Sequence, residues 1–164
     1  SLAEQNLWRA EPPASPADLK PLVVGFSVLA GLLLGQTLLG TSVREGVDAL
    51  VHQFGFDASR QGWVAQLEPG ILIHRSFSLL VLALAYWLYR RSAGLAGLRA
   101  RAGLVLLILC TEAAVGAMLF YLDLPRGLQP LHLMLSAGAW MVLVDAVAKA
   151  GLMLRATRAS RGSA

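Results

Sequence analysis

Four long runs of apolar residues, separated by shorter polar segments, form the main pattern of the sequence. The runs cover residues 21–43, 70–89, 102–122 and 130–154. A helix of about 20 residues, rising about 1.5 Å per residue, crosses the hydrocarbon core of a bilayer. Because each run is long enough to do so, the pattern predicts an all-α membrane protein built as a bundle of four transmembrane helices.

The composition indicates a lipid environment. Hydrophobic residues make up 56% of the chain and charged residues 15%, and the mean hydropathy is +0.60. A chain of this length cannot keep so much apolar surface from water, so the lipid bilayer is the expected partner. We predict a Pro-rich N-terminal segment over residues 1–20, a membrane domain over 21–154 and a basic tail over 155–164. The first run follows a polar segment without a small-residue cleavage pattern, which favours a membrane helix over a signal peptide.

Basic residues indicate how the helices are oriented. Arginines without accompanying acids lie between the second and third runs and in the tail, at positions 90, 91, 99, 101, 155, 158 and 161. The positive-inside rule then places both termini and this middle loop on the cytoplasmic side. The net charge of +4 is thus a topology signal, and nucleic acid is not an expected partner.

The long connection over residues 44–67 is the predicted outer loop. Its segment from Glu45 to Phe54 has an amphipathic pattern and predicts a short helix lying on the membrane surface. Trp63 is expected to anchor the loop at the level of the lipid headgroups. The loop is either a cover over an outer site or an ordinary interfacial connection.

A weak internal repeat divides the membrane domain into two halves. In the first and third runs a polar residue stands four positions before a glycine, and a histidine opens the run that follows. The residues are Gln36, Gly40 and His74 in the first half, and Glu112, Gly116 and His132 in the second. Two helix hairpins of the same sense can pack around a pseudo-two-fold axis normal to the membrane. This pseudo-repeat predicts that His74 and His132 face one another at equal depth.

Such a pair favours axial ligation of a haem. Two neutral imidazoles on opposite faces of the macrocycle must come from facing helices at the same depth, which His74 and His132 satisfy. In the alternative interpretation, each histidine only bonds a neighbouring hydroxyl or carbonyl near the membrane surface. Zinc is a weaker candidate, because only Glu68 is near enough to add to the ligand set. His52 lies in the outer loop, at a cofactor edge or exposed.

Three arginines are candidates for binding the haem propionates at the outer surface. Arg75 follows His74, Arg126 precedes His132 in a short loop, and Arg44 ends the first run. The alternative for each of them is an interfacial side chain that extends to the headgroups.

Glu112 is an ionisable residue within the third run, where charged groups are costly and invite a functional question. Either it makes a neutral hydrogen bond to Gln36 between helices, or it relays a proton. Asp145 and Lys149 form a further pair with helical spacing in the fourth run.

Several short motifs together resemble a known family. They are Gln36-x3-Gly40-x3-Arg44, Ile73-His74-Arg75, and Leu-Asp-Leu-Pro125 followed by Leu131-His132. Spread over residues 21–154, they are similar to one four-helix half of haem A synthase. That family consists of two such halves, each with a histidine pair. One half holds haem O, which is oxidised to haem A, and the other holds a haem b that passes electrons.

The chain departs from the catalytic half of that family. The catalytic half has a glutamate four residues before its first histidine and a cysteine pair in the outer loop. Here Gly70 stands at the first position, the nearest acid is Glu68, and Cys110 is the single cysteine of the sequence. The chain therefore resembles the half that binds haem b. Whether it is an enzyme stays open, with Glu68 and Glu112 as the candidate catalytic residues.

The resemblance implies a haem b cofactor, or haem O or haem A in its place. It implies a role in oxidation of haem O to haem A, in associated electron transfer or in assembly of a terminal oxidase. The membrane is then a bacterial-type inner membrane or a mitochondrial inner membrane, with both termini on the cytoplasmic or matrix side. A homodimer or a partner membrane subunit would complete the protein. The alternatives are a non-enzymatic b-type cytochrome and a structural subunit whose cavity is filled by Phe77, Phe120 or Trp140.

Overall fold

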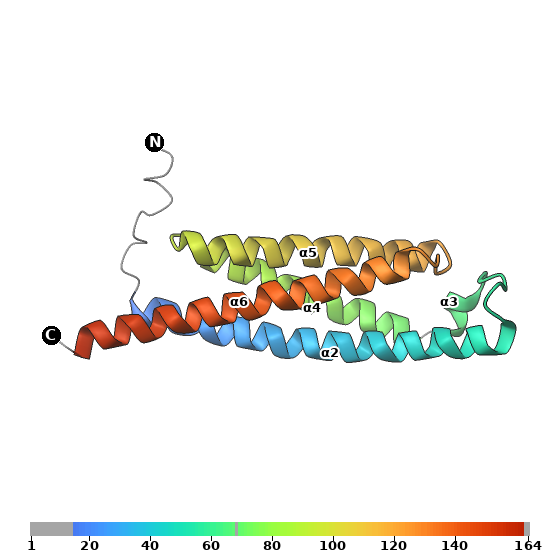
Figure 1. Cartoon of the computed structure of the whole chain (residues 1–164), viewed down its shortest axis with the longest axis horizontal. Helices are drawn as coiled ribbons and strands as arrows, with labels where there is room; N and C mark the ends of the chain where they lie inside the picture. The colour runs from blue at the N-terminus through green and yellow to red at the C-terminus, as the bar shows by residue number, and fades with distance from the viewer. Residues whose placement is uncertain (1–14, 68, 163–164) are drawn as a thin grey trace, which may run out of the picture.

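The computed structural model describes residues 15–67 and 69–162. They form α2 (Pro16–Phe54), α3 (Trp63–Gln66), α4 (Gly70–Arg91), α5 (Ala96–Tyr121) and α6 (Leu128–Gly162), with no strand in the described ranges. Figure 1 shows the long helices side by side, with α2 and α5 running in one direction and α4 and α6 in the other. We call the end that carries α3 the cap end and the opposite end, where α2 begins, the terminal end.

The all-α fold class is confirmed. Within the described residues, α2, α4, α5 and α6 are the four helices that are long and apolar enough to cross a membrane. Their outward faces are apolar: Leu79 is 66% exposed, Leu107 63% and Met141 75%. Such surfaces are costly in water and stable in lipid. The chain therefore has the architecture of a multi-pass membrane protein.

Helix α2 is longer than the first apolar run in both directions. At its start Ser15 caps the helix by accepting a hydrogen bond from the amide of Asp18 at 3.2 Å. At its end, the segment 44–54 continues α2, so the prediction of an outer loop with a separate surface helix is wrong there. The reason is that the helix meets its stop only at Gly55, whose φ of +91° favours glycine.

Helices α5 and α6 also extend beyond their predicted runs. Helix α5 begins at Ala96, since Leu98 is fully buried and gives this first turn a place in the core. Helix α6 begins before Pro130, at Leu128, because proline is tolerated in the first turn, where its missing N–H would have no helical partner. Helix α6 also includes residues 155–162, which we expected as a separate tail.

The four long helices close into a ring, because α2 packs against α4 and α6, and α5 packs against the same two helices. Helices α4 and α6 therefore face each other across the interior. Large apolar side chains that are almost fully buried fill most of that interior. They include Phe26, Leu29, Leu33, Leu88, Leu98 and Leu143.

An ion pair joins α5 to α6 in the half of the bundle near the terminal end. The Arg101 guanidinium donates to the Asp145 carboxylate at 2.5 Å. Helical spacing predicts Lys149 as the partner of Asp145, and the structure has this cross-helix pair instead. The reason is that α5 lies directly against α6, so an arginine of the neighbouring helix reaches the carboxylate.

The outer cap, which we define as residues 55–67 and the turn 122–127, covers the cap end of the ring. A second apolar cluster lies beneath it and contains Val47, Leu50, Trp63, Val115, Leu119 and Leu124. Trp63 is only 3% exposed, so it packs inside this cluster and is not the lipid-facing anchor that we predicted. The apolar face predicted for the end of α2 is therefore used against protein.

Replacement of Gly25 tests the close approach of α2 to α4. A Cβ at Gly25 would lie 2.7 Å from Leu88 Cδ2, whereas nothing lies within 4 Å of a Cβ at Gly31 in the same helix. We expect Gly25→Ala to lower the free energy of unfolding by about 1–3 kcal/mol, because overpacking forces neighbours to move. Gly31→Ala should leave it unchanged or raise it by up to about 1 kcal/mol. Thermal unfolding in detergent micelles measures both, and equal effects would contradict this packing.

Candidate functional site

Two imidazoles meet inside the bundle near the cap end. His74 is the fifth residue of α4, and His132 is the fifth residue of α6. Both helices start at the cap end and face each other across the ring, so their side chains lie at the same depth. The ring centres are 6.4 Å apart, and the ring planes are inclined at 79°. The structure thus brings together the two histidines that the sequence pairs.

A glycine on the neighbouring helix makes room for each imidazole. A Cβ at Gly40 of α2 would lie 3.1 Å from His74 Cε1, and one at Gly116 of α5 would lie 3.5 Å from His132 Cε1. The two rings also lie against the main chain one turn earlier in the same helices, at Gln36 and Glu112. Gly40 and Gly116 therefore set how far the two imidazoles can lie from the centre of the helix bundle.

Several polar atoms at this site are buried without a hydrogen-bond partner. They include Nδ1 of both histidines and Oε1 of Gln36. The amide of Gln36 donates to the main-chain carbonyl of His74 at 3.2 Å and lies 3.4 Å from Nε2 of the ring. A buried polar atom that lacks a partner costs about 1–3 kcal/mol, so most are satisfied by protein, water or a ligand.

The ligand set limits what that group is. Among the described residues no group of three His, Cys, Asp or Glu side chains is placed to hold a metal ion. A bare zinc ion would therefore lack the ligands for its tetrahedral shell. A metal that a macrocycle already holds needs only two further ligands, and two histidines line the same cavity.

A cavity with two lobes surrounds the histidine pair. The larger lobe has a volume of about 240 Å³ and lies between α2 and α6, and the smaller has about 120 Å³ and lies between α4 and α5. Gln36, His74, Glu112 and His132 line both lobes. Ligand pockets usually measure about 300–1,000 Å³, so the two lobes together fall within that range and neither does alone.

Two of the three predicted propionate-binding arginines reach this cavity. Arg75 lines the smaller lobe, and its guanidinium lies 5.3 Å from the ring centre of Phe120, as a cation–π contact. Arg44 lines the larger lobe, where it pairs with Asp48 at 2.9 Å and donates to Gln129 at 3.2 Å. No carboxylate among the described residues pairs with Arg75, which leaves its charge available to a ligand.

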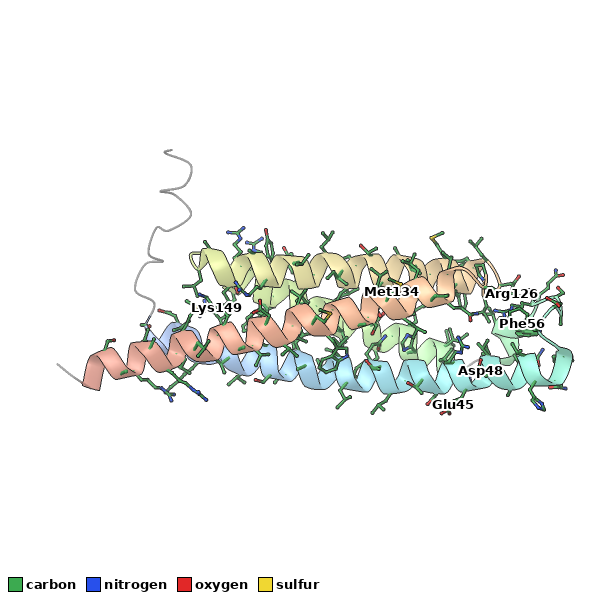
Figure 2. The ribbon with its side chains drawn as sticks, in the orientation of Figure 1. Glu45, Asp48, Phe56, Arg126, Met134 and Lys149 are labelled. Atoms are coloured by element: carbon green, nitrogen blue, oxygen red, sulfur yellow. The ribbon has the colours of Figure 1, made fainter. Side chains whose placement is uncertain are left out.

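Three other candidates of the sequence analysis do not join the site. Arg126 donates to the main-chain oxygen of Phe56 and to Asp57 at 3.2 Å, in the outer cap, and lines neither lobe (Figure 2). His52 is exposed near the end of α2 and also lines neither lobe. Glu68 lies outside the described residues.

Glu112 is the acidic residue at the cavity, and its carboxyl contacts Ser136 of α6. The expected bond from Glu112 to Gln36 is thus replaced by one to a serine that the sequence analysis missed. Ser136 follows His132 by four residues and shares its helical face, which is the signal that could have found it. Trp140, one turn further on, donates from Nε1 to Thr37 of α2 at 3.3 Å.

Arg60 holds the turn that closes the larger lobe. Asp123 and Leu124 have φ values of +54° and +61°, a conformation that costs residues other than glycine about 1–2 kcal/mol each. Arg60 donates from Nη1 to the Leu124 carbonyl at 2.9 Å, and Leu124 lines the larger lobe. Desolvation, with repulsion from Arg126 and Arg44, lowers the pKa of Arg60, although a guanidinium stays charged at neutral pH.

The fold and the site together define a four-helix membrane bundle with a bis-histidine cavity near one end. No family model, curated protein or solved structure matches this chain. Inference about function therefore starts from the paired histidines and the cavity around them.

Removal of Arg60 should loosen the cap end of the cavity. We expect Arg60→Ala to lower the free energy of unfolding by about 1–3 kcal/mol, since it leaves a carbonyl in a left-handed turn without its charged partner. Amides of residues 122–128 should exchange faster with deuterium. Arg126→Ala is the control: its side chain is 41% exposed, and loss of such a surface pair costs at most about 1 kcal/mol. A larger effect of Arg126→Ala on stability and exchange would contradict the assigned role of Arg60.

Proposed function

We propose that this chain binds one b-type haem between His74 and His132. By its resemblance to haem A synthase, we further propose a role in oxidation of haem O to haem A, in associated electron transfer or in assembly of a terminal oxidase. The facing pair of half-buried imidazoles carries the proposal. When bound, a haem with two imidazole ligands supplies reversible one-electron transfer at the iron.

The spacing of the two rings fits this cofactor. A ligating nitrogen lies about 2 Å from a metal, and the centre of an imidazole lies about 1 Å further, so two axial imidazoles have centres about 6 Å apart. The observed separation is 6.4 Å. The two-lobed cavity around the rings also fits a bound group.

Arg75 and Arg44 are the residues proposed to bind the propionates. Arg75 follows His74 in α4 and lines the smaller lobe of the cavity. Arg44 lies in α2 and lines the larger lobe. A guanidinium at low dielectric binds a carboxylate strongly and with two hydrogen bonds. The location of Arg126 in the outer cap does not support the same role for it.

The pseudo-repeat belongs to this proposal and is supported by matching contacts. His74 packs on Gly40, and His132 packs on Gly116, in each case at the imidazole Cε1 atom. Each glycine is preceded by a polar residue that lines both lobes, Gln36 in one half and Glu112 in the other. In this repeat the second half has the acidic Glu112 at the position where the first half has the neutral Gln36.

The cavity also bears on the alternatives. A structural subunit without cofactor would have its cavity filled, but Phe120 lines the two lobes without filling them, and Phe77 and Trp140 line neither. A non-enzymatic b-type cytochrome would use the same histidine pair. Catalysis of an oxidation would need a carboxylate beside the haem. Glu112 is the candidate for it among the described residues. Completion by a homodimer or a partner subunit, and cytoplasmic or matrix-side termini in a bacterial-type or mitochondrial inner membrane, remain parts of the proposal.

Substitution of the histidines tests the cofactor directly. We expect the purified protein to show a six-coordinate, low-spin b-type spectrum, and His74→Ala or His132→Ala to abolish it, because each variant lacks one axial ligand. His52→Ala is the matched control, since His52 is exposed and away from the cavity, and should leave the spectrum unchanged. Pyridine haemochrome analysis distinguishes haem b from haem O and haem A. A low-spin spectrum that survives in both cavity variants would sink the proposal.

A further inference from the structure

We propose that the haem reaches the histidine pair sideways from the lipid, through the seam between α2 and α6. By the seam we mean the gap between these helices that is lined by Thr37, Thr41 and Leu133. The proposal rests on the proposed function and adds a route to it: a planar amphiphile with carboxylates enters from the leaflet at the cap end.

The connectivity of the ring leaves this gap without a connecting loop. A connection at the cap end joins α2 to α4, residues 92–95 join α4 to α5, and residues 122–127 join α5 to α6. No segment of the described chain joins α2 to α6. These two helices can therefore separate without stretching a loop, whereas each other neighbouring pair is tied at one end.

Side-chain hydrogen bonds bridge the seam at two levels. At the cap end Arg44 of α2 donates to Gln129 of α6 at 3.2 Å. Deeper in the bundle, Trp140 of α6 donates to Thr37 of α2 at 3.3 Å. The larger lobe lies at the level between these bonds. Two bonds of this kind hold a gap closed but exchange readily, because each contributes only modestly to stability.

The residues at the mouth of the seam suit an amphiphilic ligand. Thr41 is exposed and Leu133 is 58% exposed, although both line the larger lobe, so they lie where the cavity meets the lipid. Arg44 at the outer end supplies a positive charge that can exchange its bond with Gln129 for one to a propionate.

The gap between α4 and α5 is the competing route and is less suited to entry. Its lobe is half the volume, at about 120 Å³ against 240 Å³. Arg75 of α4 lies over the ring of Phe120 of α5 and bridges this gap. The short loop 92–95 also ties these helices together.

Bulky substitutions at the two gaps distinguish the routes. Haem-free protein in phosphatidylcholine nanodiscs is mixed with ferric haem b, and the low-spin Soret band is followed by stopped flow. We expect Thr41→Trp and Leu133→Trp to slow uptake at least about tenfold, since a filled mouth raises the barrier. Ala117→Trp is the matched control: Ala117 is exposed and lines the smaller lobe. It should change the rate by less than about twofold.

The outcomes separate this proposal from the proposed function. If the wild-type protein never forms the low-spin band, haem binding itself fails. If the wild-type protein forms it, but Ala117→Trp slows uptake as much as the seam variants or more, then haem binding stands and entry through the seam is overturned.

A variant in the opposite direction provides a second test. Trp140→Phe keeps the ring and removes the hydrogen bond to Thr37, so uptake should become about two- to tenfold faster. Trp140 lines neither lobe, so the final spectrum should be that of the wild type. An unchanged or slower rate would show that opening between α2 and α6 does not limit entry.

Discussion

Lipid offers no hydrogen bonds, and this constraint governs the whole structure. Backbone groups inside a bilayer must pair within the chain, which favours long uninterrupted helices. The same rule applies to polar side chains of the long helices: Arg101 pairs with Asp145, and Glu112 contacts Ser136. Among the described residues, His74, His132 and Gln36 depart from it at the cavity, because each keeps a buried polar atom without a hydrogen-bond partner. The histidine cavity is therefore distinguished from the rest of the bundle by buried polar atoms that protein groups do not pair.

The helices and the histidine pair were predictable from sequence for simple reasons. Hydrophobic runs of membrane length have few alternatives to a helix, and two histidines at the same position after a helix start must lie at one depth. The boundaries were less predictable. The end of α2 reads as a polar, amphipathic loop, but Val47 and Leu50 pack under the outer cap, and only Gly55 ends the helix. Hydropathy alone cannot separate burial against protein from burial in lipid.

The polar surroundings of the site were predicted only in part, because they depend on how helices face each other. Arg75 and Arg44 lie at the cavity as sequence adjacency and depth suggest, whereas Arg126 turns to Phe56 and Asp57 of a loop about 70 residues away in the chain. The contacts of Arg60 with Leu124, and of Trp140 with Thr37, join elements whose relative rotation no local pattern encodes. Side-chain partners across a bundle follow from packing, and packing is a property of all four helices together.

The position of the histidines within α4 has an electrical consequence. This helix has 22 residues, and His74 is its fifth, so at about 1.5 Å per residue the imidazole lies roughly a fifth of the way from the cap end. A charge that moves to this point from the cap side crosses only a small part of the membrane potential, whereas one from the other side crosses most of it. A potential of 100 mV is worth about 2.3 kcal/mol per elementary charge. A redox partner on the cap side would therefore exchange electrons with the proposed haem almost independently of the membrane potential.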